Sequence, residues 1–171
     1  MQAKTAVALL ALPVISVLAV EPVQALDLLS PGWSHPAPCD SAASPPLLYG
    51  CYEDLTATSI TIYGQDSTTP PSSTSSSYTL PSLDQPLSIT FDASFDPAGN
   101  PDSDAFYRVG ASAPILFPGT GIGGSYALTL NPGEQLQFSI NQQFDASAAG
   151  TLRISSFEAV SYTHLTLPTK A

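Results

Sequence analysis

Oxygen ligands recur at alternate positions in one short acidic stretch. The stretch spans nine residues, is broken by Pro and Gly, and carries Asp96, Asn100, Asp102 and Asp104. Ca²⁺ binds oxygen ligands of this kind, and crowding like charges is unfavourable unless an ion relieves it. A calcium loop of this type has Gly after the third ligand and a Glu further on, whereas Ala105 follows here. The stretch is therefore either a calcium site or a solvated turn whose side chains cap their own backbone.

Catalytic residue types are scarce. A hydrolase needs a nucleophile beside a base, or two facing carboxylates. The histidines are His35, in a Pro-rich segment, and His164, near the C-terminus. No GxSxG or HExxH motif occurs, and the Gly-rich run 119–124 has no Lys to hold a phosphate. We expect a non-enzymatic protein without a cofactor, although 14 acidic residues leave a glycosidase-like carboxylate pair open.

Trp33 is the candidate for sugar binding. It stands beside Ser34 and His35, and an indole face with polar neighbours can stack on a pyranose ring. The alternative is that Trp33 packs over a nearby disulfide. Other aromatics that a strand would leave outside are Tyr49, Tyr52, Tyr63, Tyr78 and Tyr107.

Cys39 and Cys51 are the only cysteines. In an exported protein a disulfide between them persists, and in the chain-entropy model a ring of this size stabilises by about 3 kcal/mol. A metal or redox pair is the alternative, but the spacing is not CxxC and only His35 lies nearby as a further soft ligand. We expect a structural bridge.

Composition and charge restrict the class of protein. The 171 residues carry a net charge of −10, which excludes binding to nucleic acid through its phosphates. Hydrophobic residues make up 43% of the chain, which is too apolar for a disordered acidic tail, and 17 Pro break any long helix. A β-rich globular domain is left.

The sequence predicts that both terminal segments lie outside the folded domain. Residues 1–25 have a cation at Lys4, an apolar stretch and a Val23–Ala25 cleavage site, as a secretory signal peptide does, and the apolar stretch is too short for a membrane anchor. Residues 160–171 resemble translated sequencing adapter, since ten consecutive codons for Val160–Thr169 fit a transposase end. We exclude this tail, His164 included, and expect the natural C-terminus to be missing.

Periodicity predicts an antiparallel β-sandwich of seven or eight strands between these ends. Residues 26–54 form a Pro/Ser-rich lead-in over the surface with the disulfide loop, and residues 55–159 form the sandwich. A first strand is expected from Leu55 to Tyr63, with Ile60 and Ile62 on one face. The Ser/Thr-rich run 67–77 is expected to be an exposed loop.

The second half of the domain shows clearer strands. Alternation from Leu87 to Phe95 predicts a half-buried strand, and two short strands follow at 106–110 and 114–117. Asn131–Glu134 separates two alternating runs, which predicts a β-hairpin. A change from even to odd spacing predicts a bulge near Ser155 and Ser156 in the last strand.

The run from Ser88 to Ala159 resembles the sandwich of exported bacterial proteins that carry a PEP-CTERM sorting signal. The resemblance rests on Ile89–Phe91, Asp102–Tyr107, Gly124–Leu130, Pro132–Phe138 and Gly150–Phe157. It implies an extracellular or envelope location in a bacterium that makes exopolysaccharide. The Pro-Glu-Pro motif, apolar helix and basic tail of that family do not follow, as expected if the reading frame enters adapter after Ala159.

We therefore expect a secreted or cell-envelope protein with a structural or adhesive role at the cell surface or in the extracellular matrix. A carbohydrate-binding module is the alternative, and a glycosidase-like enzyme is the third. The expected partners are extracellular polysaccharide or envelope components, with no nucleic acid, and with the membrane only through export or a missing sorting helix.

The acidic stretch gives a test that separates its two interpretations. We expect Ca²⁺ and Mg²⁺ to change the thermal midpoint alike and weakly, because exposed acids feel ions only through screening. The midpoints are compared in each ion and in EDTA at fixed ionic strength. A midpoint raised by Ca²⁺ alone, by about 2.7 kcal/mol of stability at a hundredfold excess over Kd, and lost in Asp102→Asn/Asp104→Asn, would establish a calcium site.

Overall fold

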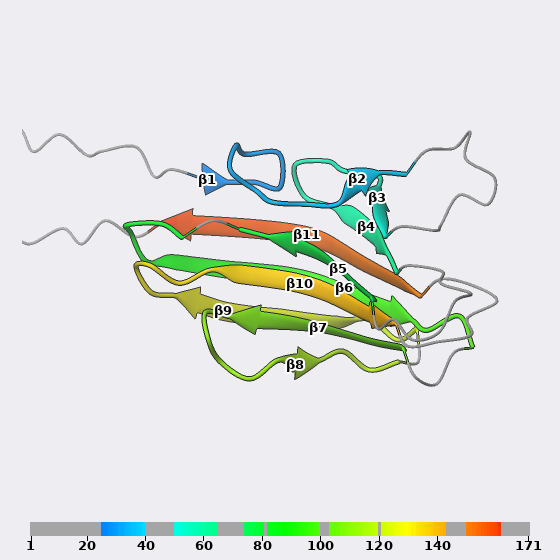
Figure 1. Cartoon of the computed structure of the whole chain (residues 1–171). Coiled ribbons are helices and arrows are strands. Elements are labelled where there is room, and N and C mark those ends of the chain that lie inside the picture. The colour runs from blue at the N-terminus through cyan, green and yellow to red at the C-terminus, as the bar shows by residue number, and fades with distance from the viewer. Residues whose placement is uncertain are drawn as a thin grey trace, which may run out of the picture.

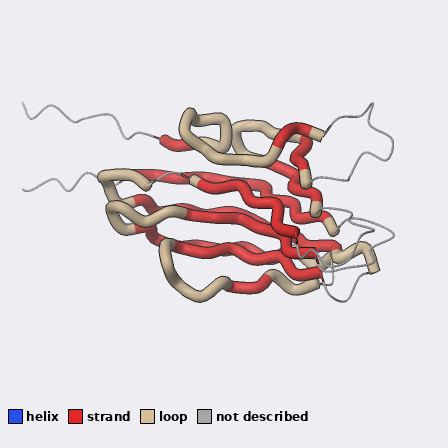
Figure 2. Tube along the Cα trace, in the orientation of Figure 1, coloured by secondary structure: helices blue, strands red, loops and turns tan. Residues whose placement is uncertain are grey.

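The chain is all-β. The structure is a computed structural model, and it describes residues 25–39, 50–64, 74–80, 82–99, 103–119, 121–142 and 150–161. These residues form strands, turns and loops and contain no helix, and the strands lie in two sheets (Figures 1 and 2). The predicted antiparallel β-sandwich is confirmed, with one short parallel pair at its edge.

The larger sheet has seven strands in the order β2-β3-β4-β11-β6-β9, and β1 pairs with the end of β11. Its strands are β1 (Ala25–Leu26), β2 (Ala37–Pro38), β3 (Cys51–Glu53), β4 (Ile60–Tyr63), β6 (Leu87–Asp96), β9 (Gly124–Leu130) and β11 (Thr151–Ser161). The smaller sheet has the order β5-β10-β7-β8. Its strands are β5 (Thr74–Thr79), β7 (Ser103–Val109), β8 (Ile115–Leu116) and β10 (Leu136–Gln142).

Strand β6 is central to the larger sheet because β11 and β9 pair with its two sides. Its apolar side chains alternate with polar ones, so Leu87, Ile89, Phe91, Ala93 and Phe95 are all buried. The intervening Ser88, Thr90, Asp92, Ser94 and Asp96 lie on the outer face of the sheet. One strand thus supplies both a wall of the core and the middle of a polar surface.

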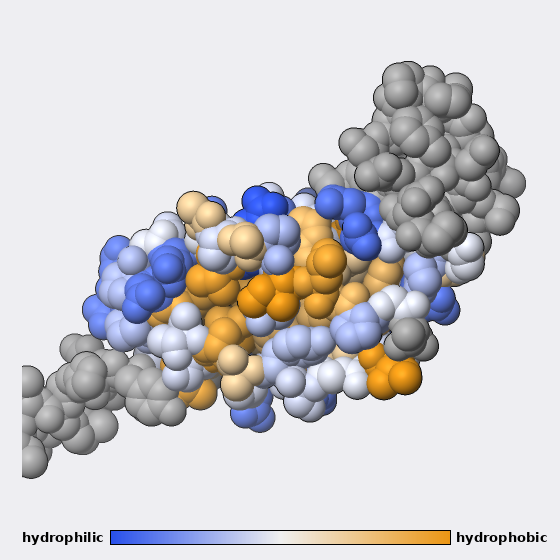
Figure 3. Space-filling view, turned by 90° about the horizontal axis from the view of Figure 1, so that it is seen from below, coloured by the Kyte–Doolittle hydropathy of each residue, from blue (hydrophilic) through white to orange (hydrophobic). Residues whose placement is uncertain are grey.

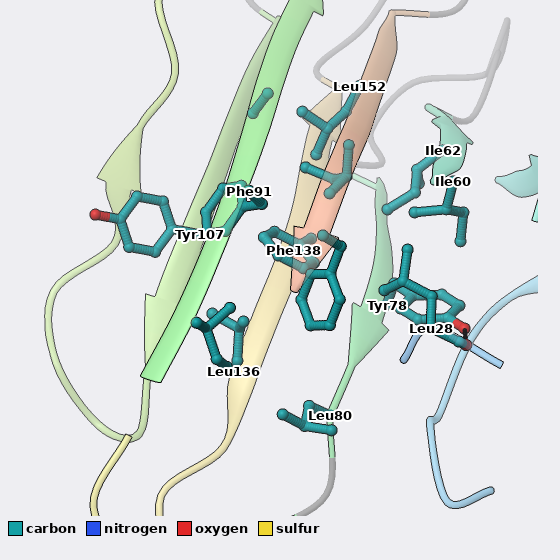
Figure 4. Close-up of a cluster of buried hydrophobic side chains, with 14 of the residues drawn as sticks. Leu28, Ile60, Ile62, Tyr78, Leu80, Phe91, Tyr107, Leu136, Phe138 and Leu152 are labelled. Atoms are coloured by element: carbon teal, nitrogen blue, oxygen red, sulfur yellow. Dashed lines mark hydrogen bonds between the residues drawn. The ribbon is translucent and has the colours of Figure 1, made fainter. Parts of the chain in front are cut away.

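The core lies between the two sheets. Phe91 of the larger sheet contacts Phe138 of the smaller sheet edge to face, with ring centroids 5.0 Å apart (Figure 4). Ile60 and Ile62 of β4 were expected on one face of their strand, and both are fully buried. At the other side of the core, Tyr107 contacts Phe91 at 5.8 Å.

The N-terminal lead-in takes part in the core, which a surface segment would not do. Leu28 and Trp33 are buried, and the Tyr78 hydroxyl donates a 2.6 Å hydrogen bond to the Leu28 carbonyl. The predicted strand from Leu55 is also shorter than expected. It begins at Ile60, because the Thr56 side chain accepts a hydrogen bond from the Ser59 backbone and closes a turn before it.

The end of the predicted Ser/Thr-rich loop is a strand. Residues 67–73 lie outside the described residues, but Thr74–Thr79 form β5 and pair with β10. Ser77 and Ser139 share a hydrogen bond of 3.1 Å across the two strands, and Gln137 donates to Ser77 at 2.9 Å. Hydroxyl groups that bond across strands in this way make a Ser-rich segment compatible with a sheet.

The predicted hairpin is wrong in its pairing, although the turn is where it was expected. Gly133 has a φ of 84°, and the Glu134 backbone donates to Asn131 across the turn at 3.0 Å. β9 then pairs with β6, whereas β10 pairs with β5 and β7 in the other sheet. The turn joins the two sheets because the apolar side chains of both strands face the core from opposite sides.

The predicted bulge in the last strand is confirmed. The register of β11 against β6 shifts between Ser155 and Glu158, and Ser156 has a φ of 52°. The strand continues two residues past the expected domain end, and Val160 and Ser161 pair with Ser88 and Leu87. Residues 162–171 lie outside the described residues, as do residues 1–24, so the adapter-derived tail and the signal peptide stay predictions.

Tyr78→Phe tests the bond that ties the lead-in to the core. Loss of the hydroxyl leaves the buried Leu28 carbonyl without this donor, so we expect unfolding free energy to fall by about 1–3 kcal/mol. Denaturant unfolding measures the change. Tyr107→Phe is the control, because Tyr107 also packs against the core but its hydroxyl makes no hydrogen bond to the residues that the structure describes.

The same substitution has a pH signature. Burial raises the pKa of Tyr78 to about 12 from 10.0. The unfolded chain loses this proton first, so the Tyr78 contribution is present below pH 10.0 and is lost as the pH rises toward 12. Tyr78→Phe should reduce the alkaline loss of stability, and an unchanged alkaline slope would contradict the assignment.

Candidate functional site

The outer face of the larger sheet is hollowed where β6, β9 and β11 lie side by side. One hollow of about 380 Å³ is lined by Thr90, Asp92, Ser125, Ala127, Ser156 and Glu158. A second of about 310 Å³ adjoins it and is lined by Asp92, Ser94, Gly123, Gly124, Ser125 and Ser155. Hydroxyls, carboxylates and small residues line both hollows, Phe91 and Tyr126 also line the first, and both hollows are open to solvent.

Asp92 stands where the two hollows meet. The strand register places it between Ser125 on β9 and Ser155 on β11. The Ser125 hydroxyl donates a 2.6 Å hydrogen bond to the Asp92 carboxylate. This bond, and a second from Ser156, lower the pKa of Asp92, so the group is a carboxylate at neutral pH.

The bulge in β11 positions Ser156. Without it, strict alternation would turn Phe157 outward, since Leu152 and Ile154 point inward. Instead Phe157 is buried, and its backbone N–H donates to the Thr58 carbonyl at 3.0 Å. Ser156 is left exposed in a left-handed conformation, within reach of Asp92. A non-glycine residue in this conformation is strained by roughly 1–3 kcal/mol.

This arrangement can bind hydroxyl groups. A carboxylate accepts hydrogen bonds, and serine and threonine hydroxyls both donate and accept them. A lowered pKa makes Asp92 a poor proton donor for glycoside cleavage. His35 lies elsewhere, on the β2 side, where its ring contacts Tyr52 and Tyr78.

Trp33 does not face the hollows. Only 8% of it is exposed, and its ring packs on Tyr78 at 4.7 Å and on Phe157 at 5.9 Å. The indole N–H donates to the Asp27 carbonyl at 3.0 Å. The stacking that a sugar would need is therefore made with protein aromatics.

The acidic stretch is only partly described. The Asp96 carboxylate accepts a 2.8 Å hydrogen bond from the Ala98 backbone, which is the local capping that a solvated turn makes. Asp104 is exposed on β7, and Asn100 and Asp102 lie outside the described residues. Within the part of the chain that the structure describes, no three His, Cys, Asp or Glu side chains are placed to hold a metal ion.

The structure contains the Cys39–Cys51 disulfide, which joins β3 to the residue after β2. A disulfide persists in oxidising compartments, so its presence accords with the expected export. None of the described residues forms a helix that is long and apolar enough to cross a membrane.

Sequence reasoning missed Asp92, Ser125 and Ser156 as a group. Asp92 was only one polar position of an alternating strand, Ser156 was only a bulge position, and Ser125 was not singled out. Strand pairing, which periodicity does not specify, brings the three together. The available signal was an acidic residue in the middle of a strongly alternating strand, combined with a bulge in another strand.

No protein-family model and no curated protein matches the sequence. Among solved structures, the chain resembles a CBM4 module with 12% identity and a TM-score of 0.39, over 77% of this chain and 95% of that one. It also resembles the CBM22-1 xylan-binding domain of Xyn10C from Paenibacillus barcinonensis, with 8% identity and a TM-score of 0.41, over 82% and 94%.

Ser125→Ala tests the contact at the centre of the hollows. Removal of the hydroxyl takes away the largest cause of the lowered pKa, so the pKa of Asp92 should rise toward its ordinary value. NMR titration of the carboxyl carbon measures it. Ser94→Ala, on the same face, should leave the titration unchanged. An unaltered pKa in Ser125→Ala would contradict the hydrogen bond.

Proposed function

We propose that this chain is a non-catalytic polysaccharide-binding module, and that it binds through the two hollows around Asp92. The observation that carries the proposal is the carboxylate of Asp92, held by Ser125 at 2.6 Å in an open, hydroxyl-lined surface. A sugar presents several hydroxyls on one side, and an ionised carboxylate can accept two of them at once.

The shape of the site supports a chain ligand over a small buried one. A small-molecule site encloses most of its ligand in an apolar pocket. Here the two hollows lie next to each other along an exposed sheet and are open to solvent, so neither encloses a ligand. Ala127, Gly123 and Gly124 leave room for a sugar ring to approach the sheet.

A location outside the cell is part of the proposal. The disulfide and the predicted signal peptide support export. The PEP-CTERM type and the structural or adhesive role remain predictions, and polysaccharide binding is one way in which a surface protein adheres to a matrix.

Binding is tested with a panel of neutral, acidic and amino-sugar polysaccharides by affinity electrophoresis and calorimetry. Asp92→Asn keeps the shape of the side chain but removes its charge. Loss of a charge-assisted hydrogen bond, about 1.5–3 kcal/mol, should weaken binding by roughly ten- to a hundredfold.

Asp96→Asn is the matched control, because Asp96 lies on the outer face of the same strand beyond the hollows. It should bind like the wild type. The proposal fails if no polysaccharide of the panel binds, or if Asp92→Asn binds as tightly as Asp96→Asn.

A further inference from the structure

The sandwich has an edge at which strands of both sheets are unpaired. β8 ends the smaller sheet and β9 ends the larger one, and within the described residues each pairs on one side only. Phe117, just after β8, contacts Tyr126 of β9 at 5.2 Å, and Tyr107 contacts it at 5.6 Å. The two unpaired strands therefore lie on the same side of the molecule.

This edge carries exposed apolar side chains. Ile115 and Leu116 of β8 are 49% and 58% exposed, and Ile122, just before β9, is 71% exposed. The view from the β8 side shows apolar side chains running across the middle of this face, with polar ones around them (Figure 3). Leu29, three residues after the end of β1, is the other large exposed apolar residue of the described chain.

Acidic side chains are absent from the same part of the sequence. Residues 105–133 contain no Asp or Glu, and this is the longest such run in a chain with 14 acidic residues. The only charge in the run is Arg108, which lies over the Phe106 ring at 5.5 Å. Acids border this run at Asp104, exposed on β7, which pairs with β8, and at Glu134, just after the run, and Asp92 lies one strand inward on β6. The run itself adds no negative charge to this edge, so it does not increase the self-repulsion of this acidic protein there.

Strand β9 lacks the devices that normally protect a sheet edge. Gly124–Leu130 has seven residues and contains no Pro and no charge. Its sequence is also compatible with itself in antiparallel register. A copy centred on Ala127 places Ser125 opposite Thr129 and Tyr126 opposite Leu128, which are favourable hydroxyl and aromatic–aliphatic pairs.

We infer that the β8–β9 edge is a homodimer interface, in which β9 of one copy pairs antiparallel with β9 of a second copy across a twofold axis at Ala127. Ile115, Leu116 and Ile122 of both copies are covered by this contact. The two larger sheets then become one continuous sheet, and both polar outer faces lie on the same side. The inferred dimer does not depend on the proposed polysaccharide binding.

Sedimentation velocity over a range of protein concentrations tests the inference without any ligand. The wild type should sediment as a dimer that dissociates on dilution. Leu116→Lys and Ile122→Lys each place a charge against the partner and should raise the dissociation constant about tenfold or more, which corresponds to 1.4 kcal/mol. Leu29→Lys, the matched exposed substitution away from the edge, should remain dimeric.

Hydrogen exchange supplies a second measurement that does not depend on the variants folding well. In the dimer, wild-type β9 amides that point away from β6 should become protected as the concentration rises. The inference is overturned if the wild type is monomeric at every concentration, if β9 exchange does not depend on concentration, or if Leu29→Lys weakens the dimer as much as Ile122→Lys.

Discussion

The alternation of β6 determines both the core and the candidate site. Its five inward side chains fill the space between the sheets, and its five outward ones form the middle of the polar face. Because the side-chain period of a strand is two, a slip of one residue would exchange the two sets. Burial of Phe91 and Phe95 therefore also fixes Asp92 on the outer face, between Ser125 and Ser155.

The bulge in β11 connects the core to this face. It lets Phe157 turn inward, where it contacts Trp33, and it leaves Ser156 beside Asp92. The strained backbone of Ser156 is held in place because Phe157 is buried and its N–H is bonded to Thr58. Packing of the N-terminal segment, through Trp33 and Tyr78, thus supports the geometry of a surface site on the other side of the sheet.

Local sequence patterns predicted well which side of a strand faces the core and where the turns lie. They predicted poorly which strands pair with each other. The alternation of β6, the inward pair Ile60 and Ile62, and the bulge near Ser156 all followed from the spacing of apolar residues. The turn at Asn131–Glu134 was also predicted, but its two strands belong to different sheets. Periodicity gives the direction of a side chain, whereas pairing depends on contacts between residues distant in sequence.

The candidate site also depends on strand pairing that the sequence pattern does not give. Trp33 attracted attention because its residue type is suited to sugar stacking, yet its ring completes an aromatic cluster in the core. Asp92 looked like an ordinary outward residue, and only the register of β9 and β11 against β6 gives it hydroxyl partners. A weakly alternating Ser/Thr segment such as β5 was hidden for a related reason, since its cross-strand hydroxyl bonds leave no apolar pattern.

The central claim is that the outer face of the larger sheet binds polysaccharide. The most direct measurement is an NMR titration of the labelled protein with a polysaccharide that binds it, in which shifted amides are mapped onto the structure. We expect shifts concentrated at Asp92, Ser125 and Ser156 and their neighbours on β6, β9 and β11. Shifts concentrated around Trp33, or on the outer face of β10 and β7, would contradict it.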